Sequence, residues 1–255
     1  MSALKAASRS GAPFADELAF AEGLSIRAGE VLMDRYERVE RVDYKSARDV
    51  VTEVDHLSEE LIIEAIRARF PDDGILAEES GEHVAVAGSA PTSGRGRTWI
   101  VDPLDGTPAV GVIHDPSRHE TFGATVSGSA TLEGRQIAAS DKDKLSDYVV
   151  HLALGGRRIA TRIRQTRKQI RVSRNMGAAA LAIAYVAAGR FDAFVQEGGL
   201  STWDIAAAGL IAERAGAQVT AMDGGPWFDL GHGTRSIGLI AAPPAHHGTL
   251  LELVR

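Results

Sequence analysis

The second half of the chain alternates short apolar runs with Ala-rich segments, and this alternation constrains the fold more than any other feature of the sequence. Three apolar runs predict strands, at residues 191–195, 218–221 and 236–241. Three segments with helical spacing predict helices, at residues 177–188, 203–215 and 249–254. Gly189 and Gly216 follow the first two helices directly, where a C-terminal cap is expected. This alternation predicts an α/β arrangement.

The first half follows a different pattern. Apolar residues spaced by three and four predict two helices, at residues 14–36 and 58–70, the second ended by Pro71. Compact apolar runs predict strands at 98–101 and 110–113, and residues 81–97, rich in Gly, Ala, Ser and Pro, predict a surface loop. We therefore expect an N-terminal α+β lobe over residues 1–142 and a C-terminal α/β lobe over residues 143–255.

The composition excludes several classes of protein. Of the 255 residues, 44% are hydrophobic and 24% are charged, values typical of a globular protein and not of a disordered or collagen-like chain. Because the chain has no cysteine, disulfide scaffolds, thiolate metal sites and cysteine nucleophiles are excluded. The net charge of −6 argues against a protein built for nucleic-acid binding, and no stretch has the apolar length of a membrane span. We expect a cytoplasmic protein with no nucleic-acid or membrane partner.

Residues 99–107, with the sequence WIVDPLDGT, carry the sharpest chemical signal. A buried strand ends there in two carboxylates, Asp102 and Asp105, and α/β sheets commonly bind ligands at such strand ends. Pro103 stops the strand, and Gly106 permits a tight turn. Because Asp-Pro and Asp-Gly are also ordinary turn dipeptides, these nine residues alone leave a polar turn and a metal site equally open.

Acidic residues gather at three further places. Glu78 and Glu79 end a short apolar run, where adjacent negative charges are costly unless a cation neutralises them. Asp204 begins an apolar helix and residues 49–55 are acidic, although both places also fit ordinary helix N-caps. Four such clusters, with oxygen ligands only, indicate hard divalent cations and above all Mg²⁺.

Four motifs follow one another along the chain: DVVTEVD (49–55), AEES (77–80), WIVDPLDGT (99–107) and STWDIAAAG (201–209). In these motifs, from about residue 14 to the C-terminus, the chain resembles the inositol monophosphatase family of lithium-sensitive, magnesium-dependent phosphatases. The resemblance implies a layered αβαβα sandwich of the sugar-phosphatase type, a homodimer and two or three Mg²⁺ ions. Such ions suit the reaction, because they neutralise a phosphate monoester dianion and lower the pKa of a bound water.

The resemblance also implies a role for each matching residue. The metal ligands are four carboxylates and one backbone carbonyl: Glu78, Asp102, Asp105, Asp204 and Leu104. The catalytic residues are Thr107 and Asp49, which orient and deprotonate the attacking water, together with Glu78. The backbone N–H groups of Gly106 and Thr107 cradle the phosphate. The remaining substrate contacts come from Asp105, Ala179, Glu197 and Asp204, with Glu197 on the alcohol part of the substrate.

The implied substrate is a small phosphorylated polyol or sugar, with inositol monophosphate as the best single choice. Three enzymes that share this metal site remain open as alternatives: 3′-phosphoadenosine 5′-phosphate phosphatase, histidinol-phosphate phosphatase and fructose-1,6-bisphosphatase. A relative that binds metal or a partner without turnover also remains open.

Three departures from the family pattern bear on these expectations. Thr107 is followed directly by Pro108, where the family has a loop and a whole core strand. Either this segment is deleted or the printed sequence omits it; we expect omission, because losing a core strand leaves backbone groups unpaired in a marginally stable domain. Ala77 replaces the usual Gly. Ala178 and Ala179 provide no hydroxyl at the substrate wall, which weakens the case for inositol phosphate itself.

A basic stretch and two pairs of histidines could also bind ligands, but structural explanations are favoured for both. Residues 155–174 contain eight Lys or Arg and no acid, a pattern that could bind a nucleotide or nucleic acid. The spacing of the isoleucines in this stretch instead favours an amphipathic helix that faces solvent or a dimer edge. The pairs His114–His119 and His246–His247 could bind zinc, but neither has a convincing third ligand.

Overall fold

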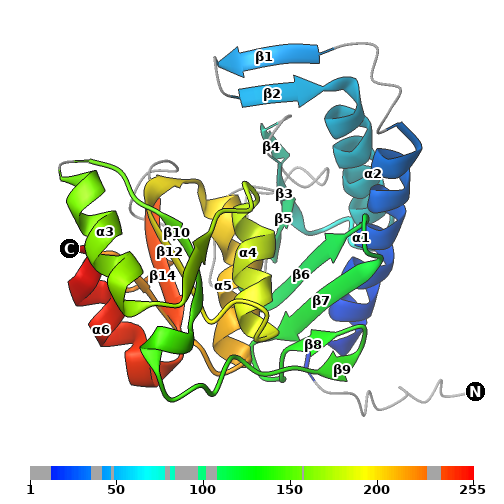
Figure 1. Cartoon of the computed structure of the whole chain (residues 1–255). Helices are drawn as coiled ribbons and strands as arrows, with labels where there is room; N and C mark the ends of the chain where they lie inside the picture. Colours follow the sequence, from blue (N-terminus) through cyan, green and yellow to red (C-terminus); the bar gives the residue numbers. More distant parts are fainter. Residues whose placement is uncertain are drawn as a thin grey trace, which may run out of the picture.

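The computed structural model describes residues 13–35, 42–46, 49–77, 81–83, 97–101, 108–156, 158–228 and 237–255. These residues form five layers, in the order helix, sheet, helix, sheet, helix (Figure 1). In the figure the layers run from the blue helices on the right to the green and red helices on the left. This arrangement is the αβαβα sandwich expected from the sequence.

Two long helices form the first layer: α1 (Ala15–Arg35) and α2 (Glu53–Arg69). Their apolar stripes share a small core with the neighbouring strand β3 (Gly74–Ala77), made of Leu24, Ile63, Ile66, Ile75 and Ala77. The helix expected over residues 58–70 begins five residues earlier. The prediction was wrong there because it placed the acidic residues ahead of the helix, whereas acids are also favourable inside the first turn.

An aromatic cluster joins these helices to the next strand, β5 (Thr98–Val101). The ring of Trp99 stacks on Phe70 at a centroid distance of 5.0 Å, and Phe20 meets both rings edge-on. The indole Nε1 of Trp99 donates a hydrogen bond to Asp73 at 2.8 Å. Trp99 therefore packs into this cluster and fixes β5 against the first layer.

Two small sheets lie near the first layer. The strands β1 (Val42–Ser46) and β2 (Asp49–Thr52) form an antiparallel pair that leads into α2 (Figure 1). In the other sheet β3 lies between β4 (Gly81–His83) and β5, and it is parallel to β5. Residues 81–83 thus form a strand where a loop was expected, because their backbone pairs with β3; residues 84–96 of that expected loop lie outside the described part of the chain.

A third sheet follows, with the strand order β6-β7-β8-β9. Its strands are β6 (Val110–Asp115), β7 (Glu120–Thr125), β8 (Thr131–Leu132) and β9 (Arg135–Gln136). Among the described residues, β6 is hydrogen-bonded in a ladder only to β7, and β5 only to β3. Within the described part of the chain, β5 and β6 are therefore edge strands, as expected if one core strand is missing between Thr107 and Pro108.

The central layer contains α4 (Ala179–Ala187) and α5 (Thr202–Arg214). Both helices are rich in alanine, which lets the two sheets approach them closely. Gly111 of β6 shows how closely, because a Cβ atom at this position would lie 2.9 Å from the carbonyl oxygen of Ala207 in α5. The largest cluster of buried residues lies around these two helices.

The second large sheet has the strand order β11-β10-β12-β14-β13. Its strands are β10 (Val149–Ala153), β11 (Val172–Arg174), β12 (Ala193–Leu200), β13 (Gln218–Ala221) and β14 (Ile237–Ala242), and a 3-10 turn (Leu145–Asp147) precedes them. The outer layer over this sheet is α3 (Ile159–Gln169) with α6 (Pro244–Val254). The helix expected over residues 249–254 begins at Pro244, since proline fits the first turn of a helix. None of the helices in the described ranges is long and apolar enough to cross a membrane.

Candidate active site

One end of strand β12 brings together three of the residues named from the sequence. Residues 188–192 join α4 to β12, and Ser201 alone joins β12 to α5. The first turns of both helices therefore lie at the end of β12 that Leu200 occupies. Ala179 begins α4, Glu197 lies near this end of β12, and Asp204 lies in the first turn of α5.

Asp204 is a half-buried carboxylate held by its own helix. Its Oδ2 accepts a hydrogen bond from the backbone N–H of Ser201 at 2.7 Å. Burial raises the pKa of Asp204 above the ordinary aspartate value, and the bond from Ser201 offsets this only in part. Within the described residues Oδ1 accepts no hydrogen bond, so this oxygen is free to bind a cation. The donor chemistry fits a hard divalent metal such as Mg²⁺.

Glu197 is ionised and held at two points. Its Oε1 forms a salt bridge with Nη2 of Arg162 at 2.9 Å, and its Oε2 accepts a hydrogen bond from the backbone N–H of Gly155 at 2.7 Å. Partial burial opposes ionisation, but the bonds from Arg162 and Gly155 hold the pKa of Glu197 below its ordinary value. Glu197 is therefore a fixed hydrogen-bond acceptor at this edge of the sheet.

The backbone of Glu197 is also fixed. The pairing of β12 with β14 shifts register between Gln196 and Leu200. Opposite this irregularity, a Cβ atom on Gly238 would lie 2.4 Å from the carbonyl oxygen of Glu197. Only glycine lets the two strands come so close, so Gly238 contributes to the position of Glu197.

The other predicted residues are placed less fully. Asp49 is the first residue of β2 and pairs with Ser46 of β1. Six residues of the predicted site lie outside the described part of the chain: Glu78, Asp102, Leu104, Asp105, Gly106 and Thr107. The described strands that precede them are informative. Since β3 and β5 are parallel, with Ala77 opposite Val101, the chain leaves the two strands at neighbouring positions just before Glu78 and Asp102.

Three of the four histidines considered for zinc have other partners. Nδ1 of His114 lies 3.0 Å from Oγ1 of Thr121, and Nε2 of His247 lies 3.0 Å from Oγ1 of Thr220. Nε2 of His246 lies 2.8 Å from a backbone carbonyl oxygen. In the described ranges no three His, Asp or Glu side chains gather where they could hold a metal ion. A zinc site at these histidines is therefore not supported.

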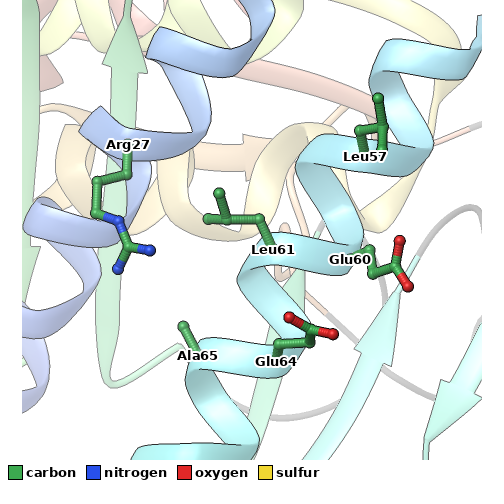
Figure 2. A pocket seen from close by; sticks show the side chains of 6 residues that line it. All are labelled: Arg27, Leu57, Glu60, Leu61, Glu64 and Ala65. Carbon is green, nitrogen blue, oxygen red and sulfur yellow. The ribbon is translucent and has the colours of Figure 1, made fainter.

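A shallow pocket of about 600 Å³ lies away from these residues, between α1 and α2 (Figure 2). Its lining consists of Arg27, Leu57, Glu60, Leu61, Glu64 and Ala65. None of these six residues belongs to the predicted site. The pocket is in the outermost layer, so it does not bear on the chemistry of Asp204 and Glu197.

Arg162 and Gly155 were missed by the sequence reasoning. They lie in the basic stretch 155–174, which was interpreted as a surface helix. The exposed face of α3 agrees with that interpretation, but Arg162 turns inward with only 12% of its side chain exposed. No acid lies near this arginine in the sequence, but the same holds for every cation of the stretch, so this feature did not single out Arg162.

Comparison with known proteins agrees with the fold. The profile of the inositol monophosphatase family matches residues 15–109 and 107–255. The two matches meet where the core strand was expected. Because the sequence runs directly from Thr107 to Pro108 and the two matches adjoin there, the expected omission is not supported, and the sequence lacks the segment at this point.

Several characterised proteins are similar over most of their length. "Nus factor SuhB" of Pseudomonas aeruginosa is 35% identical over 80% of this chain and 85% of its own. The "Fructose-1,6-bisphosphatase/inositol-1-monophosphatase" of Thermotoga maritima is 33% identical over 82% and 86%. The solved structure of a Thermotoga maritima IMPase has a TM-score of 0.79 at 31% identity and covers 94% of this chain and 96% of its own. By these matches the chain belongs to the inositol monophosphatase family.

Proposed function

We propose that this protein is a metal-dependent phosphomonoesterase that acts on a small phosphorylated polyol or sugar. The observation that carries the proposal is the pair of carboxylates at the end of β12. Asp204 is half-buried with one oxygen available for a cation, whereas Glu197 is ionised and oriented. Family membership and relatives named as inositol monophosphatases support the same conclusion.

The residues that would hold the metal are the carboxylates of Glu78, Asp102, Asp105 and Asp204, with the carbonyl of Leu104. When bound, Mg²⁺ supplies positive charge against the phosphate dianion and acidifies a water molecule. We propose two or three such ions.

The chain's own groups have the remaining roles. The N–H groups of Gly106 and Thr107 bind phosphate oxygens. Thr107 and Asp49 hold the attacking water and accept its proton. Glu197 accepts hydrogen bonds from hydroxyl groups of the alcohol part, and Ala179 adds an apolar surface beside it. These assignments give each part of the substrate a separate partner.

Inositol monophosphate is the first choice of substrate, because Glu197 suits a ring with several hydroxyl groups. Fructose 1,6-bisphosphate is the next choice, since the name of the Thermotoga maritima relative includes both activities. We also propose a cytoplasmic homodimer that is inhibited by lithium.

A second candidate is a protein that binds a partner without turnover. Two observations favour it: among the described strands, β5 and β6 are each paired on one side only, and several relatives are named Nus factor. In this case the chain would retain the fold and lose the phosphate cradle after β5.

Phosphate release from a panel of substrates separates these possibilities. The panel contains inositol 1-phosphate, fructose 1,6-bisphosphate, histidinol phosphate and 3′-phosphoadenosine 5′-phosphate, each with Mg²⁺. The proposal expects the highest kcat/KM with inositol 1-phosphate. Release from the nucleotide alone would overturn the substrate ranking, and no release from any compound would favour the second candidate.

A further inference from the structure

Arg162 lies in the most basic part of the chain but, unlike the neighbouring cations, it is largely buried. The neighbouring cations of α3 and β11 are exposed: Arg158, Arg164, Arg167, Lys168, Arg171 and Arg174. Arg162 instead points toward the sheet, with 12% of its side chain exposed. Burying a guanidinium is costly unless its N–H groups are satisfied, so its contacts indicate what it does.

The guanidinium contacts several parts of the fold. Nη2 pairs with Oε1 of Glu197 at 2.9 Å. Nη1 donates to the carbonyl oxygen of Gly155 at 3.2 Å, and Nε donates to that of Val254 at 2.9 Å. The planar group is thereby anchored to the loop after β10 and to the end of α6, and its Nη2 is directed at Glu197.

Gly155 completes this arrangement. Its carbonyl oxygen accepts from Arg162, and its N–H donates to Oε2 of Glu197 at 2.7 Å. Among the described residues, each carboxylate oxygen is thus held by one donor. A carboxylate can accept about four hydrogen bonds, so about two acceptor directions remain, and their orientation is fixed.

We propose that Arg162 is a positioning residue that orients Glu197 to accept hydrogen bonds from the hydroxyl groups of the substrate. This inference rests on the proposed function, in which Glu197 contacts the alcohol part. Lysine cannot take this role fully, because an ammonium group lacks the planar fork that reaches two carbonyls and a carboxylate at once.

The test compares two substrates of the full-length protein. Inositol 1-phosphate has hydroxyl groups for Glu197, and p-nitrophenyl phosphate has none. Arg162→Gln should raise the KM for inositol 1-phosphate about tenfold relative to the KM for p-nitrophenyl phosphate, the size expected when one hydrogen-bonding partner is lost. Arg162→Lys should restore part of this ratio. Arg164→Gln, an exposed neighbour on the same helix, should leave both KM values at the wild-type level.

A double-mutant cycle separates positioning from general stability. If Arg162 acts through Glu197, Arg162→Gln should change the KM ratio less than about twofold when Glu197→Gln is already present. An equal rise in both KM values, or full additivity with Glu197→Gln, would overturn the inference while the phosphatase assignment stands. If the wild-type protein hydrolyses neither substrate, the proposed function fails and the inference fails with it.

Discussion

The imidazole ring of His151 stacks on the ring of Phe194, with centroids 4.6 Å apart and an interplanar angle of 19°. His151 is 1% exposed, and within the described residues neither ring nitrogen has a hydrogen-bond partner. Burial lowers the pKa of His151 below 6.5, and the nearby Gln196 side chain opposes this shift only in part. The folded state therefore holds His151 in its neutral form.

This burial predicts how stability depends on pH. The unfolded chain takes up a proton on His151 below its ordinary pKa of 6.5, whereas the folded chain does not. The contribution of His151 to the free energy of unfolding should therefore be constant above pH 6.5 and should fall as the pH drops below that value. His151→Phe keeps the stack and removes the titration, so its unfolding free energy should fall less between about pH 6.5 and 5. Urea unfolding at several pH values measures these free energies. An identical fall with pH in the wild-type protein and in His151→Phe would contradict the prediction.

The close packing at Gly111 predicts that adding one methyl group there destabilises the fold. A Cβ atom there would lie 2.9 Å from the carbonyl oxygen and 3.0 Å from Cα of Ala207, both in the backbone of α5. Because a helix backbone cannot yield as a side chain can, Gly111→Ala should destabilise the fold by about 1–3 kcal/mol.

Gly248 provides the matched control for this substitution. It is exposed inside α6, and a Cβ atom there would meet nothing within 4 Å. Gly248→Ala should stabilise the protein by about 0.5–1 kcal/mol, since alanine has less backbone freedom in the unfolded state. In urea unfolding, the free energy of unfolding should change in opposite directions in the two variants. If Gly111→Ala leaves it unchanged, α5 does not pack this closely.

The ion pair between Arg190 and Glu120 joins the loop before β12 to β7. Both guanidinium Nη atoms lie 2.6 Å from the carboxylate oxygens, and the guanidinium lies 4.8 Å from the ring centroid of Tyr185. Arg190→Lys loses this two-point geometry and should cost about 1 kcal/mol at this partly exposed site. Arg118→Lys alters a more exposed, single-point contact with Asp115 and should cost less. Equal losses in thermal unfolding would contradict the role of the paired bonds.

A substitution at Asp204 tests whether this residue is a metal ligand or only a helix cap. Asp204→Asn retains an oxygen that can accept the N–H of Ser201, so the fold should remain intact. It removes the negative charge, and the rate of phosphate release should fall by roughly 100-fold or more. Loss of a residue that only hydrogen-bonds to a metal ligand typically lowers activity by about 10- to 100-fold, so a larger fall indicates a direct ligand.

Asp223 is a suitable comparison for that variant. Its Oδ1 accepts the N–H of Gly225 at 2.8 Å in an exposed turn, so it resembles Asp204 in binding a local backbone N–H but not in position. Asp223→Asn should retain wild-type activity. If Asp204→Asn also retains it, Asp204 is a cap and not a ligand.

Much of the fold followed from local patterns. The glycines after α4 and α5 have φ of +65° and +92°, as expected for C-terminal caps. The errors have two causes. Residues 81–83 form β4 because they pair with the edge of β3, a tertiary contact that no local pattern shows. The starts of α2 and α6 were missed because the apolar spacing does not include the acids in the first turn of α2 or Pro244 in that of α6.

The candidate site was predictable in part. The sequence named Glu197 and Asp204, and the chain path places them at one end of β12. It could not show the Arg162–Glu197 pair, because the two residues lie on separate elements and only folding brings them together. It also led us to expect that the printed sequence omits a core strand. A tryptic peptide that spans residues 98–118 without insertion would check the direct junction of Thr107 and Pro108 by mass.

Phosphate release from inositol 1-phosphate by the full-length protein, with Mg²⁺ and after chelation, tests the central claim most directly. The account predicts hydrolysis that requires Mg²⁺, stops with the chelator and returns when Mg²⁺ is restored. Hydrolysis at the same rate in both conditions, or none in either, would contradict it.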